Sequence, residues 1–158
     1  MRRFKPIHGI LVVLVFLGII LVADMALEGR LGGSRYERVS PDREGMVRVD
    51  VADLQPLEVR YFRFLNTGNQ EVKFFVGRDG TGELQVAFDA SETHARVGRG
   101  FRHEVEWMVD NKCDTAVRLA EVNSGGGGCR AVPPAHRVQC VEMLLAETDI
   151  LQGWRYFR

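Results

Sequence analysis

The chain has 158 residues, of which 46% are hydrophobic and 27% are charged, so it can form one folded domain but not two of ordinary size. Its 21 basic residues balance its 21 acidic residues, which removes the usual electrostatic case for binding nucleic acid. Three cysteines cannot complete a four-thiolate zinc or iron–sulfur site, and they cannot all pair in disulfides.

An apolar run at the front of the chain has the pattern of a membrane anchor. It covers residues 9–23, resumes as far as Leu27, and follows the basic residues Arg2, Arg3 and Lys5. A helix over residues 6–27 would reach about 33 Å, enough to cross a hydrocarbon core of about 30 Å. We therefore expect residues 1–28 to form one transmembrane helix, a signal anchor in a bacterial inner membrane with its N-terminus in the cytoplasm and the rest of the chain in the periplasm.

Two alternatives to the retained anchor remain open. A cleaved signal peptide has the same pattern, but it needs small residues before the cut, and Leu21 or Asp24 would occupy one of those places. A buried core helix is the other alternative, which the preceding basic residues disfavour. Residues 29–45 are rich in Gly, Arg and Ser, so they predict a tether that leads to an exported domain over residues 46–158.

Alternating apolar residues predict that this domain is mainly β, a small β-rich α+β domain of antiparallel hairpins. Turn residues at 66–69 and 78–82 separate three of the expected strands and favour a meander. The expected strands are 47–51, 61–65, 72–76, 84–88, 101–109 (one strand or a short hairpin), 117–122 and 138–145, and Thr148 is expected to cap a final helical turn.

The sequence offers little support for an enzyme. The glycine run 125–128 lacks the lysine and hydroxyl residues that follow a phosphate-binding loop, and no helix is expected after it. No nucleophile elbow or triad spacing is present. From residue 46 onward, 14 basic residues meet 16 acidic ones, so no basic stripe is expected to bind lipid head groups. We expect a non-enzymatic protein.

Two polar turns carry the one chemically interesting pattern. Ser91 and His94 follow one expected strand, and Asp110 and Cys113 follow the next. A spacing of three residues lets both side chains of a pair face one metal ion, as in C-x-x-C sites. Ordinary polar turns would explain the same residues, and from spacing alone they are the better interpretation.

Residues 72–129 resemble the FtrD-like membrane iron–sulfur-containing family, because the order of several short motifs agrees. The matching residues are Val72–Val76, Arg78–Gly80, Leu84–Ala90, Gly100–Arg102, Trp107–Val109, Asn111, Cys113, Gly126–Cys129 and Val132–Pro133, and a closing aromatic near Tyr156–Phe157 also fits. The resemblance implies two C-x-x-C pairs that hold an iron–sulfur cluster or metal. It also implies a place beside iron permeases on the outer side of the cytoplasmic membrane.

This sequence departs from that pattern at the implied ligands. Ser91 and His94 stand at the first pair, and Asp110 and Cys113 at the second, while Cys129 matches the cysteine of the family's glycine loop. Three of the four implied thiolates are therefore missing, so an all-cysteine cluster is not expected.

Two hypotheses follow from these departures. In the first, the ligands His94, Asp110, Cys113 and Cys129 hold a single transition-metal ion, Fe, Cu or Zn, and Ser91 is a bystander. In the second, the domain binds no metal and serves as a structural or docking subunit of a membrane complex, with a metal permease as the expected partner. An adhesion or assembly subunit of another membrane complex is a further alternative, marked by an exposed apolar patch. Disulfides from Cys129 to Cys140 or to Cys113 are both allowed.

Overall fold

The structure, a computed structural model, describes residues 15–23, 34–93, 98–125 and 127–158. The chain divides into an N-terminal unit that ends at Arg35 and a domain from Tyr36 to Arg158. Residues 15–23 of the first unit are helical and have exposed side chains. Within the described parts of the chain, no helix is both long enough and apolar enough to cross a membrane.

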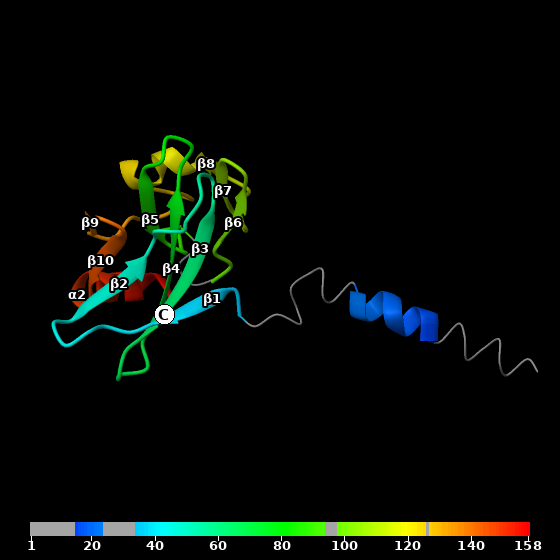
Figure 1. The fold of residues 1–158 in the computed structure, drawn as a ribbon, viewed down its shortest axis with the longest axis horizontal. Coiled ribbons are helices and arrows are strands. Elements are labelled where there is room, and N and C mark those ends of the chain that lie inside the picture. The colour runs from blue at the N-terminus through cyan, green and yellow to red at the C-terminus, as the bar shows by residue number, and fades with distance from the viewer. Residues whose placement is uncertain (1–14, 24–33, 94–97, 126) are drawn as a thin grey trace, which may run out of the picture. The chain divides into compact units, whose positions relative to one another are not determined.

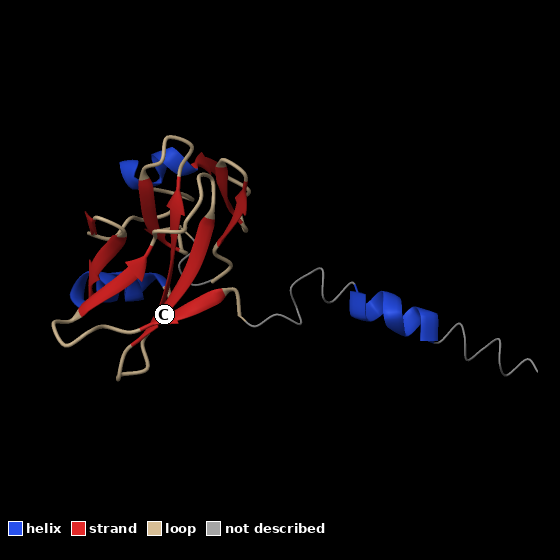
Figure 2. Ribbon diagram, viewed as in Figure 1, coloured by secondary structure: helices blue, strands red, loops and turns tan. Residues whose placement is uncertain are grey.

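The domain is built mainly from short strands, as the alternation of apolar residues predicts (Figures 1 and 2). The strands are β1 (Tyr36–Val39), β2 (Met46–Asp50), β3 (Val59–Leu65), β4 (Glu71–Arg78), β5 (Leu84–Phe88), β6 (Phe101–Glu104), β7 (Trp107–Asp110), β8 (Ala116–Arg118), β9 (Arg137–Gln139) and β10 (Glu142–Ala146). The helical elements in the described part of the domain are the 3-10 helix η2 (Leu119–Ser124), the α-helix α2 (Glu147–Gln152) and the 3-10 helix η3 (Gly153–Tyr156).

The central sheet contains the expected meander of β3, β4 and β5. A fourth strand, β1, pairs in parallel with β3 at the edge of this sheet, with Tyr36 opposite Tyr61. The antiparallel register aligns Phe62 with Phe74 and Phe74 with Phe88, so these three rings lie on one face. The turns have the chemistry that the sequence indicates: Asn69, for example, takes a left-handed φ of 60°.

Two three-stranded sheets complete the domain, in the orders β2-β10-β9 and β6-β7-β8. The larger core cluster joins Phe62, Phe74 and Phe88 to Val49 and Met143 of the first of these sheets. The opposite face of the meander contributes Phe75 and Ala87 to a second cluster with Phe101, Met108 and Leu119. The central sheet is therefore buried on both faces, which explains its nearly continuous apolar sequence.

Residues 138–145 differ from the single strand expected there, and residues 101–109 take the hairpin form of the two expected, for one common reason. The stretches 101–109 and 138–145 are each a hairpin, of β6 and β7 and of β9 and β10, the first being one of the two forms expected there. Their turns place Val105 at φ 55° and Cys140 at φ 54°. Left-handed backbone is unusual for such residues, so neither position reads as a turn in the sequence.

The remaining differences lie at element ends. The sequence predicts a strand over residues 117–122, but the strand ends at Arg118 and the 3-10 helix η2 follows. The expected helix cap at Thr148 is wrong, because α2 starts at Glu147 and its N-cap position is Ala146. Residues 36–39, within the expected tether, form β1.

Candidate functional site

The two polar turns that the sequence singles out come together in the structure, next to the glycine loop. Ser91 forms an isolated antiparallel bridge with Ala131, beyond the glycines. The backbone N–H of Thr93 donates to the carbonyl of Gly128 at 3.3 Å. The buried hydroxyl Oγ of Ser91 donates to Oδ2 of Asp110 at 3.0 Å. Three segments far apart in sequence, 89–93, 110–113 and 127–131, thus form one site.

Asp110 organises the turn that follows β7. Its Oδ1 accepts hydrogen bonds from the backbone N–H groups of Lys112 at 2.8 Å and Cys113 at 3.1 Å, while Oδ2 accepts the Ser91 hydroxyl. Only 3% of Asp110 is exposed. A buried carboxylate must be hydrogen-bonded to offset its desolvation, and both oxygens of Asp110 have donors.

A disulfide between Cys113 and Cys129 closes the site. The two Cα atoms lie 6.7 Å apart, within the range that disulfides span, and the cysteines are 16 residues apart in sequence. Cys113 is exposed and Cys129 is half-buried. Of the two pairings that the sequence allows, the structure therefore has Cys113 with Cys129, and Cys140 is a free, exposed thiol at the β9–β10 turn.

A second buried carboxylate, Asp89, supports the site from the side of the central sheet. Its Oδ1 accepts the backbone N–H of Phe101 at 2.6 Å, and its Oδ2 accepts the hydroxyl of Tyr36 at 2.5 Å. Gly100 lies so close that an added Cβ would approach Oδ2 of Asp89 to 2.5 Å. The N–H of Asn111 also donates to the carbonyl of Gly100 at 3.0 Å, which joins this segment to the Asp110 turn.

A small crevice of about 10 Å³ lies between these segments, which leaves room for about one water molecule. Its lining includes Ser91 and Asp110 and the exposed basic residues Arg99 and Lys112. This volume is too small for an organic molecule.

Comparison with known proteins assigns the family. The family model described as "Membrane iron-sulfur containing protein FtrD-like" matches residues 54–157. The chain belongs to the FtrD-like family. Comparisons with curated proteins and with solved structures find no match. The resemblance seen in the sequence is therefore confirmed, and the match covers the meander, all three segments of the site and the C-terminal helices.

The residues of this FtrD-like chain do not fit an iron–sulfur cluster. Such a cluster needs thiolate at nearly every corner, with histidine as the main substitute. The site holds two cysteines, bonded to each other, and the third, Cys140, is in the β9–β10 hairpin. Among the residues that the structure describes, no group of three or more His, Cys, Asp or Glu side chains is arranged to hold a metal ion.

The four proposed metal ligands differ in where they lie and in what they contact. Asp110, Cys113 and Cys129 lie in one site, as the hypothesis requires, but they are engaged in hydrogen bonds and the disulfide. His94 lies outside the described residues. Ser91, expected as a bystander, donates the hydrogen bond that joins the two turns. Nothing in the sequence indicates that bond, nor the contact between Gly100 and Asp89.

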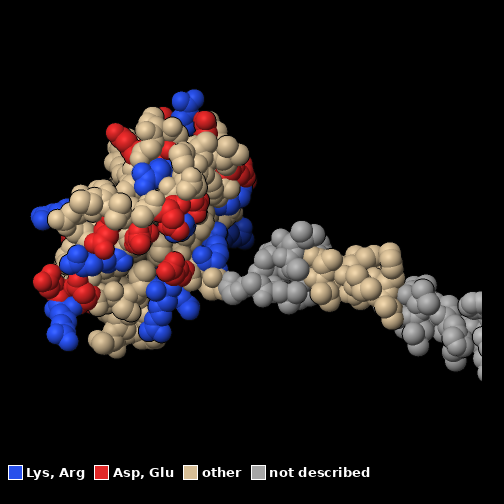
Figure 3. Space-filling model, viewed as in Figure 1, with Lys and Arg blue, Asp and Glu red and all other residues tan. Residues whose placement is uncertain are grey.

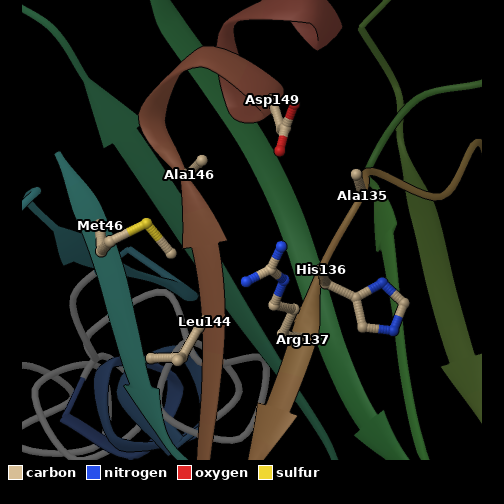
Figure 4. A pocket seen from close by; sticks show the side chains of 7 residues that line it. All are labelled: Met46, Ala135, His136, Arg137, Leu144, Ala146 and Asp149. Atoms are coloured by element: carbon tan, nitrogen blue, oxygen red, sulfur yellow. The ribbon is translucent and has the colours of Figure 1, made fainter.

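The surface of this FtrD-like domain also has larger hollows, among them one of about 270 Å³ lined by Arg48, Asp53 and Arg60, and one of about 280 Å³ beside β2 and β10. Met46, Leu144 and Ala146 form its apolar part, and Figure 4 shows His136 and Arg137 turned to opposite sides of the segment that carries them. His136 lies 3.1 Å from the carbonyl of Pro134 through Nδ1. Because His136 is turned away, few polar groups remain to fix a ligand in this hollow, which makes it a weaker candidate site.

Charged side chains of both signs are mixed on the face of the domain seen in Figure 3. Local ion pairs account for several of them, such as Arg60 with Asp53 at 2.9 Å and Arg102 with Glu104 at 2.6 Å. The observed face has no single-sign field that would attract a polyanion or a polycation.

Proposed function

We propose that this chain is a non-enzymatic accessory subunit of an iron-transport or redox assembly, attached to the bacterial inner membrane through residues 1–28 with its domain in the periplasm. In the oxidised form its domain binds no metal and acts as a docking or structural unit beside a metal permease. The single observation that carries this version is the disulfide between Cys113 and Cys129, which occupies the two sulfurs of the site.

Three arguments support this proposal. The family match gives the membrane and iron context. The disulfide favours the periplasm as the compartment, because disulfides persist there and are rare in the cytoplasm. An apolar run preceded by basic residues, as at the front of this chain, is typical of an anchor that exports the segment on its C-terminal side.

The alternative of an adhesion or assembly subunit elsewhere would need a continuous exposed apolar patch. The exposed apolar side chains described in the domain are Val105, Trp107, Val138 and Val141. They lie in hairpins of two different sheets, β6–β7 and β9–β10, so they do not favour that alternative.

Metal analysis of the full chain, purified from membranes without reductant, tests the oxidised version. We expect less than about a tenth of an equivalent of any transition metal, because neither sulfur is available as a thiolate ligand. We also expect a genomically adjacent metal permease to co-purify with the chain. A stoichiometric metal in the oxidised protein, or failure of the permease to co-purify, would contradict the proposal.

A second candidate function, binding of one Fe, Cu or Zn ion, is favoured by the meeting of Asp110, Cys113 and Cys129 at one place. It requires the reduced form, in which the cysteines can become thiolates. Titration of the reduced chain with Zn²⁺ under nitrogen tests it, with the Cys113→Ser chain as the variant and the Cys140→Ser chain as the matched control. Loss of binding in the first variant alone supports the ion site, and equal binding by both variants excludes it.

A further inference from the structure

The disulfide between Cys113 and Cys129 lies at the surface, and this position indicates a role in addition to cross-linking the fold. Cys113 is exposed in the turn after β7, whereas Cys129 is half-buried at the end of the glycine loop. Thiol–disulfide exchange requires an incoming thiolate to reach one sulfur in line with the bond, so access decides which sulfur is attacked. Of the two cysteines, Cys113 is the more exposed residue, so its sulfur is the expected point of attack.

The segments that the disulfide joins are also held together by other bonds. Ser91 hydrogen-bonds Asp110, and Ser91 pairs with Ala131 in a β-bridge. The N–H of Phe88 donates to the carbonyl of Val132 at 2.9 Å, which holds the chain after the glycine loop against β5. Opening the disulfide therefore removes one restraint on the loop around Cys129, whose Gly128 carbonyl still accepts the Thr93 N–H, and leaves the buried part of the site in place.

The backbone on both sides of the bond can move when the bond opens. Gly125, Gly127 and Gly128 have φ values of 108°, 128° and 60°, and a Cβ added at any of the three would meet no atom within 4 Å. On the other side, Asp114 follows Cys113 with a left-handed φ of 51°. Open space around glycines allows Cys129 to separate from Cys113 without moving the core.

We propose that the Cys113–Cys129 disulfide is an exchange site for a dithiol reductant of the thioredoxin-like class. The reductant's thiolate attacks Sγ of Cys113, a mixed disulfide forms, and Cys129 leaves as a thiolate that takes up a proton. The reductant's second thiol then attacks the reductant's first sulfur, which is bonded to Cys113 in the mixed disulfide. This attack releases Cys113. Two electrons and two protons pass to the chain, and the reductant becomes a disulfide.

This inference deepens the proposed function by naming how the same site is controlled, and it rests on that function for the choice of partner assembly. In the sequence, Cys113 lies between the basic Lys112 and the acidic Asp114, and Arg130 follows Cys129. Cationic neighbours favour the approach of a thiolate and stabilise a leaving thiolate. Arg130 also pairs with Glu121 at 3.6 Å, so Lys112 is the more available of the two.

Thiol counting on the oxidised full chain in detergent tests the proposal. The chain is treated under native conditions with thioredoxin and its reductase, quenched with acid, and labelled with a maleimide of known mass. Of three cysteines one is free, so the labelled thiols should rise from one to three per chain. The matched Cys140→Ser chain should rise from zero to two, which assigns the new thiols to the pair.

A trapping experiment identifies the attacked sulfur. A thioredoxin whose second active-site cysteine is replaced by serine cannot complete the reaction, so it should stay linked to the chain through Cys113, as peptide mass spectrometry can show. Tryptophan fluorescence and far-UV circular dichroism should stay unchanged after reduction, because the other bonds hold the site.

Two results would overturn the proposal: a thiol count that stays at one until denaturant is added, or an adduct on Cys129 rather than Cys113. These outcomes are independent of the proposed function. Exchange without co-purification of the permease would contradict the accessory role alone, and co-purification without exchange would contradict this inference alone.

Discussion

Ser91 and Asp110, which are 19 residues apart in the sequence, form a buried hydrogen bond of 3.0 Å between Oγ and Oδ2. This bond joins the turn after β5 to the turn after β7, the two turns where the sequence suggests metal ligands. A serine–carboxylate bond thus connects the places at which the family resemblance implies thiolates.

Replacing Ser91 with Ala should lower the free energy of unfolding by about 2 kcal/mol, because the buried Oδ2 of Asp110 loses its hydroxyl donor. Urea unfolding followed by tryptophan fluorescence measures the change. The exposed Ser124 provides a matched control, and Ser124→Ala should change stability by less than about 0.5 kcal/mol. Equal effects of the two substitutions would show that the Ser91 bond contributes nothing.

Removing the disulfide with the double substitution Cys113→Ser and Cys129→Ser should also lower stability. The loop spans 16 residues, for which the loss of chain entropy in the unfolded state is worth about 3 kcal/mol. The Cys140→Ser chain, measured without reductant, should unfold at the wild-type urea concentration. A loss of stability in that control would argue against the assigned pairing.

Gly100→Ala should be strongly destabilising. The backbone at Gly100 has φ 63°, and the new Cβ would stand 2.5 Å from Oδ2 of the buried Asp89. Crowding together with left-handed backbone should cost about 3 kcal/mol.

A comparison with Gly98 separates the two causes of that loss, crowding and left-handed backbone. Its φ of 61° is nearly the same, but a Cβ there would meet no atom within 4 Å. Gly98→Ala should therefore cost only about 1 kcal/mol, which is the cost of the backbone conformation alone. If thermal unfolding shows the same loss for both alanine variants, contact with Asp89 is not the cause.

The lowered pKa of Asp79 predicts that the stability of the domain depends on pH. Burial raises the pKa of this carboxyl, but hydrogen bonds from the Thr81 hydroxyl, from Gln85 and from two backbone N–H groups outweigh burial and hold the pKa below its ordinary value. Because the folded-state pKa is the lower one, the stabilisation is fully present above the unfolded pKa of about 4 and is lost as the pH falls through the folded pKa.

Asp79→Asn should therefore reduce stability at pH 7 by about 1 to 2 kcal/mol, and its deficit relative to wild type should shrink as the pH falls below about 4. Urea unfolding at a series of pH values measures this. Glu83 is exposed in the same turn, and Glu83→Gln serves as the control with little expected change. A deficit that stays constant between about pH 7 and about pH 3 would contradict the assignment.

Much of the fold could be predicted because one-sided burial leaves a period of two in the sequence. In β2, Val47 and Val49 are buried while Arg48 is exposed, and that alternation is visible in the letters alone. A hairpin over residues 101–109 was one of the two expected forms, but its turn position at Val105 and the turn at Cys140 could not be predicted, because their backbone is imposed by the strands on either side and not by turn-forming residues. Strand β1 could not be predicted either, because its four residues lie in a segment whose composition is that of a tether.

The candidate site was only partly predictable. Motif order brought Asp110, Cys113 and Cys129 into one hypothesis, and the structure places them together. Whether two nearby cysteines bind an ion or each other depends on their separation and on the redox state, and sequence spacing contains neither. The role of Ser91 depends on a contact between distant turns, which no local pattern encodes.

The edge strand β1 determines how the domain should be excised for crystallisation. A fragment that starts at Met46 would lose the strand that pairs with residues 61–64 of β3 and the tyrosine that bonds Asp89. An uncovered strand edge invites intermolecular sheet formation, so such a fragment should precipitate on concentration. A fragment that starts at Ser34 keeps the flank of β3 covered and should remain monodisperse.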